Sequence, residues 1–136
     1  MQPCEFEELG HTAEIGLRVR APVPGRLFAC AGMALFALSG AAAEAVEIER
    51  AVVVESPDAE SLLVDWLSEL VYLYETTGCA FHAIEVTEWS PQRLAATARG
   101  GRPIELPRLH VKAVTYHDLY VREIDAGWEA QVFLDI

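Results

Sequence analysis

A histidine, a hydroxyl group and a carboxylate fall within four consecutive residues near the N-terminus, at His11, Thr12 and Glu14. Glycines flank this stretch at Gly10 and Gly16. Side chains of these types can hold a cation or move a proton. The same short pattern also occurs in ordinary turns, where the histidine and the hydroxyl bond to local backbone, so on its own it leaves both interpretations open.

The segment after these residues has the pattern of a half-buried strand. Apolar side chains at Ile15, Leu17 and Val19 alternate with glycine or arginine, which is the period of two expected for a strand. Glu14 has the same parity as Arg18. We therefore expect its carboxylate to point away from the core at the start of the strand.

Further carboxylates lie elsewhere in the chain. The last alternating segment, Trp128–Ile136, runs to the final residue, so Asp135 and the terminal carboxylate of Ile136 are expected together at one end of a sheet. Asp65 and Glu69 lie one helical turn apart, a like-charge pair that costs about 0.2–0.5 kcal/mol unless it is neutralised. A solvated helix face is the ordinary interpretation of that pair, and a bound cation or basic partner is the alternative. Oxygen ligands without thiolates select hard cations such as Ca²⁺, Mg²⁺ or Mn²⁺.

Composition limits the classes of partner. The 136 residues suit one domain, 1–136, and the hydrophobic share of 52% indicates a globular chain. Ten basic and twenty-one acidic residues give a formal charge of −11. Because nucleic-acid and anionic-membrane binding depend on basic side chains, neither is expected directly. A cation or a protein with a basic surface suits this charge better.

The cysteines and the apolar segments indicate a cytoplasmic protein. Cys4, Cys30 and Cys79 are odd in number and widely spaced, so we expect them to be reduced. Cys30 is expected to be a small core residue. No basic region precedes an apolar segment, so no signal peptide is expected. The apolar stretch Leu27–Ala43 is shorter than the roughly 20 residues that a bilayer requires, which favours a buried helix.

The pattern along the chain predicts an α+β fold with a mixed or antiparallel sheet. One buried helix begins near Pro24 and ends at Gly40. A second is opened by Ser56-Pro57-Asp58, runs to about Thr77 and ends at Gly78. Strands are predicted at Val46–Glu55, Phe81–Trp89, Arg93–Ala98, Val111–Ile124 and Trp128–Ile136, with turns at Gly100-Gly101 and at Asp125–Gly127.

The motifs of common enzyme classes are absent from the sequence. It contains no GxSxG, no P-loop, no GxGxxG after a strand and no HExxH. His82 alternates within an apolar segment and is expected to be packed. The residues by themselves therefore predict a small acidic α+β protein, with a carboxylate metal site as one possibility, and do not identify a function.

Four sequence blocks carry a resemblance to a known family. They are GHTAEIGL at 10–17, LLVDWLSEL at 62–70, VKAVTYH at 111–117 and the terminal LDI at 134–136. Their order and spacing resemble the archease family from about Phe6 to the last residue. The resemblance implies a compact single archease-like domain with strand-helix-strand modules and two main helices.

The resemblance also implies a function and its residues. Archeases are accessory proteins, not enzymes, that activate RtcB-type GTP-dependent RNA ligases in tRNA splicing and RNA repair by promoting guanylylation and multiple turnover. A divalent cation, calcium in particular, is then expected on Glu14, Asp135 and the carboxylate of Ile136. Lys112 and His11 are expected to act toward the partner, with Lys112 either contacting phosphate or pairing with Asp135.

One departure from the family pattern concerns the predicted metal site. The first motif of the family is normally His-Thr-Ala-Asp, whereas this chain has Glu14 in place of the aspartate. The longer side chain suits a flexible calcium site better than the tighter octahedral geometry of magnesium. An alternative from another class is a metal-dependent hydrolase or phosphoesterase that uses the same carboxylates, with His11 as acid or base.

Overall fold

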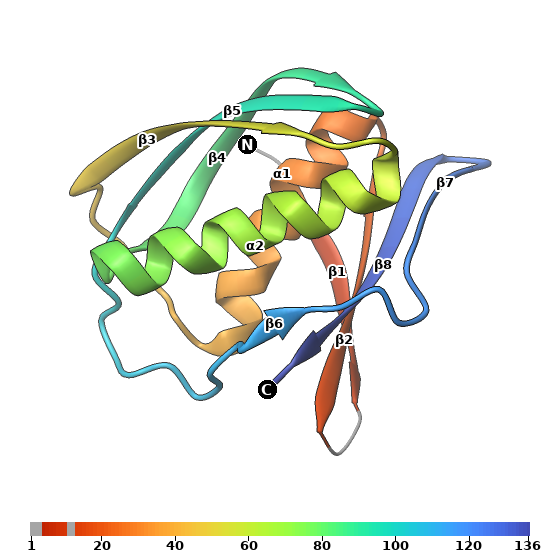
Figure 1. Ribbon diagram of the computed structural model, residues 1–136. Helices are drawn as coiled ribbons and strands as arrows, with labels where there is room; N and C mark the ends of the chain where they lie inside the picture. The colour runs from red at the N-terminus through yellow and green to blue at the C-terminus, as the bar shows by residue number, and fades with distance from the viewer. Residues whose placement is uncertain (1–3, 11–12) are drawn as a thin grey trace.

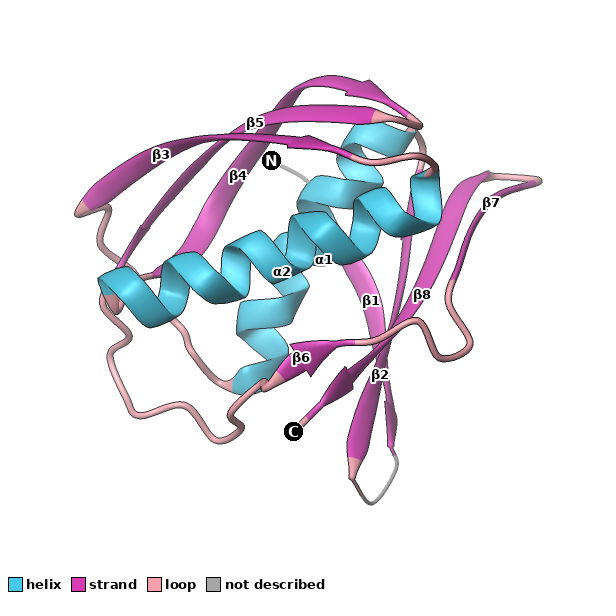
Figure 2. Ribbon diagram, in the orientation of Figure 1, coloured by secondary structure: helices cyan, strands magenta, loops and turns pink. Residues whose placement is uncertain are grey.

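Two antiparallel sheets pack against two helices in the computed structural model, which describes residues 4–10 and 13–136 (Figures 1 and 2). One sheet has the strand order β1-β2-β8-β6, with β7 also paired to β8, and the other has the order β3-β5-β4. In chain order the elements are β1 (Glu5–Gly10), β2 (Glu14–Ala21), α1 (Pro24–Ser39), β3 (Ile48–Glu55), α2 (Ala59–Thr77), β4 (Ala80–Ser90), β5 (Arg93–Gly101), β6 (Ala113–Val114), β7 (Tyr120–Ile124) and β8 (Gly127–Asp135). The predicted α+β fold with two main helices and strand-helix-strand modules is confirmed.

Helix α1 lies between the two sheets, where it contacts β2 on one side and β4 on the other (Figure 1). This position explains why its sequence is apolar nearly all round, since several of its faces must be buried. Pro24 stands in its first turn and Gly40, with φ of 79°, caps its end as predicted. No helix within residues 4–10 and 13–136 is long and apolar enough to cross a membrane.

Helix α2 crosses α1 (Figure 2), and a buried tryptophan joins the two helices. The side chain of Asp58 accepts a hydrogen bond from the Ser61 backbone N–H at 2.8 Å and so caps the first turn. Trp66 is fully buried, and its indole N–H donates to the carbonyl oxygen of Phe28 in α1 at 2.8 Å. The helix ends at Gly78, whose φ of 73° is the left-handed cap that the sequence predicted.

The pairing of β2 with β8 sets the geometry of the larger sheet. In this antiparallel register Leu17 lies opposite Val132, and both side chains are buried in the core. The outward positions pair Gly16 with Phe133. A one-residue slip would turn the apolar set of both strands toward solvent, so burial of the inner face fixes this register.

Several predicted strand limits are wrong. Gly100 and Gly101 do not form a turn but are the last two residues of β5. Other backbones approach them closely: an added Cβ atom would lie 2.1 Å from the carbonyl oxygen of Ala80 at Gly100 and 2.4 Å from that of Ala45 at Gly101. The predicted strand 111–124 is broken into β6 and β7 by residues 115–119, where Asp118 has a positive φ of 48°. Strand β3 begins two residues later than predicted, and β1 was not predicted at all.

The prediction that all three cysteines are reduced is also wrong. Cys4, directly before β1, forms a disulfide with Cys30 in α1, 26 residues away, whereas Cys79 is free and buried. Cys30 is buried as expected, with 2% of its surface exposed, but its sulfur is bonded. A cross-link over this separation removes chain entropy from the unfolded state worth about 3.5 kcal/mol in the loop-closure treatment.

We predict that Gly16→Ala destabilises the fold through overpacking. A Cβ atom at this position would lie 2.7 Å from the Phe133 ring and 2.8 Å from the Leu9 side chain. Leu9 belongs to β1, and its side chain lies on the same outward face of the sheet. Overpacking of this kind typically costs about 1–3 kcal/mol. Denaturant unfolding measures the difference.

Gly10→Ala is the matched control, since no described residue apart from the chain neighbours lies within 4 Å of a Cβ atom there. Equal free energies of unfolding for the two variants would contradict the close packing of Phe133 over Gly16.

Candidate functional site

Two of the predicted acidic residues lie opposite each other at one end of the larger sheet. Glu14, the first residue of β2, is the cross-strand partner of Asp135, the last residue of β8. Glu14 is half-buried and Asp135 is exposed. Like charges directly opposite on antiparallel strands repel, so the arrangement needs solvation or a bound cation to offset that cost.

The chain terminus and Lys112 border the same pair. The backbone N–H of Ile136 donates to the carbonyl of Ala13 at 3.4 Å, which holds the last residue beside the start of β2. On the other side, the backbone N–H of Lys112 donates to the carbonyl of Asp135 at 2.8 Å. The exposed Lys112 side chain forms no salt bridge with any described residue, so the predicted ion pair with Asp135 is not observed.

His117 is a neighbour of this pair that the sequence analysis did not single out. Its Nε2 atom lies 3.7 Å from Glu14 Oε1 and 3.2 Å from Asp118 Oδ2, and its ring packs edge-on against Phe133 at a centroid distance of 5.4 Å. The left-handed backbone of Asp118 turns the chain here. His117 is the last residue of the sequence block VKAVTYH at 111–117. No local pattern relates it to Glu14, about a hundred residues earlier in the chain.

The donor atoms at this end of the sheet suit a hard cation. Carboxylate oxygens come from Glu14, Asp135 and the chain terminus, and no thiolate lies among them. Within residues 4–10 and 13–136, no three or more His, Cys, Asp or Glu side chains stand close enough to hold a metal.

The remaining predicted residues lie away from this pair or outside the described chain. His11 falls outside the described residues. Asp65 is exposed on α2 and accepts a hydrogen bond from the Ser56 hydroxyl at 2.5 Å, while Glu69 is half-buried one turn further along. The half-buried ring of His82 bonds through Nε2 to the carbonyl of Ala45 at 3.1 Å.

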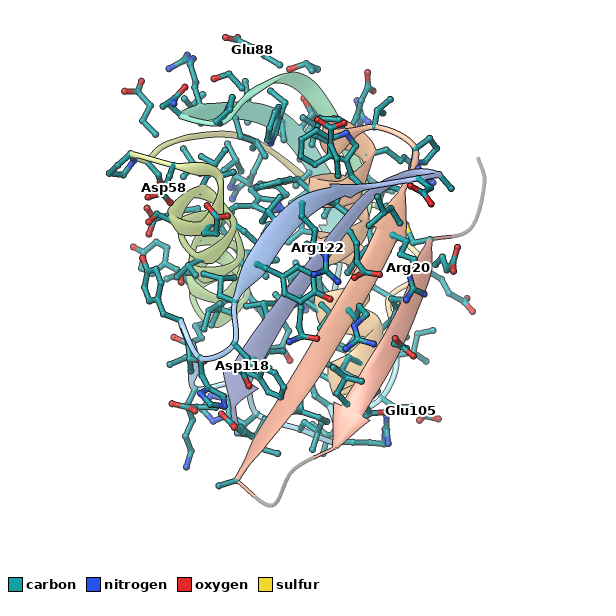
Figure 3. The ribbon with its side chains drawn as sticks, turned by 90° about the vertical axis from the view of Figure 1, so that its right-hand side faces the viewer. Arg20, Asp58, Glu88, Glu105, Asp118 and Arg122 are labelled. Carbon is teal, nitrogen blue, oxygen red and sulfur yellow. A yellow bond between two sulfur atoms is a disulfide. The ribbon has the colours of Figure 1, made fainter. Side chains whose placement is uncertain are left out.

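A second polar cluster covers the outward face of the same sheet, at the opposite end of β2 and β8. Figure 3 shows Arg20 and Arg122 on this side of the molecule. Glu129, only 6% exposed, accepts hydrogen bonds from Arg20 Nε at 2.6 Å, Arg122 at 3.0 Å and the Tyr120 hydroxyl at 2.7 Å. The Arg122 guanidinium also lies 4.1 Å from the centre of the Tyr120 ring.

These contacts stabilise the charged form of Glu129. The hydrogen bond from Tyr120, together with those from the two arginines, lowers the pKa of Glu129 to about 2, although burial acts in the opposite direction. Burial and the charge of Glu129 raise the pKa of Tyr120. The cluster therefore fastens β7 and β2 to β8, and it is separate from the Glu14–Asp135 pair.

Comparison with known proteins identifies the family of the chain. Residues 6–136 match the Archease protein family (MTH1598/TM1083). The archease of Methanosarcina mazei is 37% identical over 143 residues, a match that covers 99% of this chain and 98% of the relative. This chain belongs to the archease family. The archease of Methanopyrus kandleri is similar, with 36% identity over 140 residues that cover 96% of this chain and 99% of the relative.

Solved structures of archease-like proteins share the fold. The solution structure of Methanobacterium thermoautotrophicum protein 1598 matches with a TM-score of 0.76 and 31% identity, over 96% of this chain and 98% of that one. The crystal structure of a Thermotoga maritima archease, described as a possible chaperone, has a TM-score of 0.67 and covers 96% of both chains. Its sequence identity is 20%, so it supports the fold alone.

We predict that Glu129→Gln destabilises the fold by about 3 kcal/mol at neutral pH, because folding lowers the pKa of the carboxylate from 4.5 to about 2. This contribution is fully present above pH 4.5, the ordinary pKa of the group, and is lost as pH falls toward about 2. The difference in unfolding free energy between wild type and Glu129→Gln should therefore shrink over that interval.

Glu123→Gln, on the exposed part of the neighbouring strand β7, is the control and should change the unfolding free energy by less than about 0.5 kcal/mol. A pH-independent gap between wild type and Glu129→Gln would contradict the assigned charge of Glu129.

Proposed function

We propose that this chain is an accessory protein that activates an RtcB-type GTP-dependent RNA ligase in tRNA splicing and RNA repair. It acts in the cytoplasm by promoting guanylylation and multiple turnover of the ligase, and it performs no catalysis itself. Membership of the archease family supports this proposal.

The structural observation that carries the proposal is the Glu14–Asp135 pair. The register of β2 and β8 holds these two carboxylates opposite each other, and the terminal carboxylate of the chain follows directly after Asp135. A divalent cation between them would offset their repulsion. We assign calcium to this position, because its flexible coordination tolerates the longer Glu14 side chain better than a magnesium site does.

The net charge of this protein favours association with the proposed partner. An RNA ligase needs a basic surface for phosphate, and a chain of net charge −11 is attracted to such a surface. Lys112 is exposed beside Asp135 and forms no salt bridge with the described residues, so its ammonium group is available for a phosphate or a carboxylate of the partner. The net negative charge of the chain provides attraction, and Lys112 provides a contact of the opposite sign.

We predict that extending the chain at its C-terminus abolishes divalent-cation binding while the fold is retained. An extension converts the terminal carboxylate into a neutral carbonyl, so the cation loses one of about three anionic ligands. Ile136 remains half-buried against the core. Calorimetric titration with Ca²⁺ should show the loss, and circular dichroism should show unchanged secondary structure.

Asp135→Asn should resemble the extension, whereas Asp65→Asn, on the exposed face of α2, is the matched control and should bind Ca²⁺ normally. Equal Ca²⁺ affinity for the free and extended termini would place the cation elsewhere, with Asp65 and Glu69 as the next candidates.

The proposed activity predicts that substoichiometric amounts of this protein raise the number of RNA ends joined per RtcB-type ligase molecule well above one. The protein alone should join no RNA and hydrolyse no phosphate ester. Asp135→Asn and Lys112→Ala should each reduce the stimulation, since one removes a cation ligand and the other a partner contact.

Measured turnover of purified ligase with guanosine triphosphate, RNA ends and Ca²⁺ or Mn²⁺ tests this prediction. Phosphoester hydrolysis by the purified chain, lost in Glu14→Gln, would favour the metal-dependent hydrolase instead. Stimulation that is unchanged in both variants would separate any activation from the Glu14–Asp135 end of the sheet.

A further inference from the structure

Two adjoining hollows form a groove along the C-terminal half of α2. The first, of about 250 Å³, lies between α1, α2 and the chain that leads from β5 to β6. The second, of about 270 Å³, lies between α2 and β6. Val71 and Glu75 line both hollows, and we call the two together the α2 groove. Figure 1 shows the chain between β5 and β6 passing below the C-terminal end of α2.

The first hollow has a mostly apolar lining. Leu35 and Phe36 of α1 line it and are otherwise buried, with 2% and 5% of their surfaces exposed. Ser39 adds little polarity, because its hydroxyl already donates to the carbonyl of Phe36 at 3.0 Å. Water in such a hollow finds few hydrogen-bond partners. An apolar side chain that displaces the water is therefore favoured.

Exposed apolar side chains extend this surface beyond the hollows. Tyr72, in the wall of the second hollow, is 58% exposed, and Leu106, next to Pro107 of the first hollow, is 92% exposed. Large apolar side chains gathered beside an apolar hollow mark protein interaction sites. Because the apolar surface continues outside the hollows, the groove suits a protein segment with one inserted side chain.

Helix α2 brings negative charge to one end of the groove. The helix carries four carboxylates and no lysine or arginine, and its last turn contains Glu75 without a basic residue. The C-terminal end of a helix is itself negative, so Glu75 adds to an unfavourable charge there. His110 Nε2 lies 3.7 Å from Glu75 Oε1, but it offsets that charge only when the ring is protonated. A lysine or arginine of a partner beside Glu75 would be stabilised by both negative charges.

The same charges select between the possible occupants. Two copies of this chain, each of net charge −11, would bring the carboxylates of their α2 helices together, which is unfavourable. A partner with a basic surface has the complementary charge. The groove also reaches the candidate functional site, since Lys112 lines the second hollow and its backbone N–H donates to the carbonyl of Asp135 at 2.8 Å.

From these observations we infer that the α2 groove is the docking site for a segment of the RtcB-type ligase. The segment inserts an apolar side chain between α1 and α2 and places a neighbouring lysine or arginine beside Glu75. The inference rests on the proposed ligase activation and adds to it the surface that holds the ligase next to the Glu14–Asp135 end of the sheet.

Binding of the full chain to an immobilised RtcB-type ligase, measured as Kd by biolayer interferometry, tests the apolar contact. Val71→Phe places a larger side chain where the two hollows meet and fills the space of the inserted side chain. It should raise Kd about ten-fold or more, as loss of a central apolar contact does. Thr76→Phe, exposed on the same helix and outside both hollows, is the matched control and should change Kd less than about two-fold.

Glu75→Lys tests the charge. It should raise Kd about five-fold or more at about 0.05 M salt and less at about 0.5 M, because salt screens an exposed charge. The substitution also removes an unfavourable charge from the helix end, so the melting temperature should not fall. Glu123→Lys, on the exposed part of β7, changes the net charge equally and is the control. Equal weakening by both variants would overturn the placement of a cation beside Glu75.

The remaining outcomes separate this inference from the proposed function. If the wild-type chain stimulates the ligase while Val71→Phe and Glu75→Lys bind it as tightly as wild type, the docking site is overturned and the proposed function stands. If the wild-type chain neither binds nor stimulates the ligase, the proposed function fails and the docking site fails with it. Sedimentation equilibrium of the chain alone should show a monomer. A dimer that Val71→Phe dissociates would make a second copy the occupant and overturn the inference.

Discussion

The antiparallel register between β2 and β8 is the constraint on which most of this structure depends. It buries the inner side chains, such as Leu17 opposite Val132. The same register places Glu14 opposite Asp135 at one end of the outward face. Because side chains alternate along a strand, none of these pairings can change without the others. Core formation and the candidate cation position therefore come from one choice of register.

The two helices pack against the larger and the smaller sheet, so that the buried side chains form one hydrophobic core. Helix α1 contacts both sheets, and α2 is tied to it through the hydrogen bond from Trp66 to the carbonyl of Phe28. Burying an indole N–H without a partner would be costly, so this bond fixes the crossing of the helices as well as filling space. The disulfide adds a covalent link at the edge of the sheet, where the packing of β1 is sparse.

Local sequence determined the features that depend on neighbouring residues. The alternation from Ile15 onward predicted β2, the glycines at 40 and 78 marked the helix ends, and Asp125–Gly127 predicted the hairpin between β7 and β8. Each is set by backbone preference or by a short-range hydrophobic period, which a single segment contains in full. The same alternation placed Glu14 and Asp135 on outward faces and at strand ends.

Tertiary structure alone decided what joins distant segments. The Cys4–Cys30 bond connects residues 26 apart, and no spacing rule indicates such a pair. His117 lies beside Glu14 in the segment 115–119, which interrupts the strand that periodicity predicted. Gly100 and Gly101 continue β5 because two other backbones approach there. Each outcome depends on packing between segments far apart in the chain, and local propensity is too weak a preference to decide it.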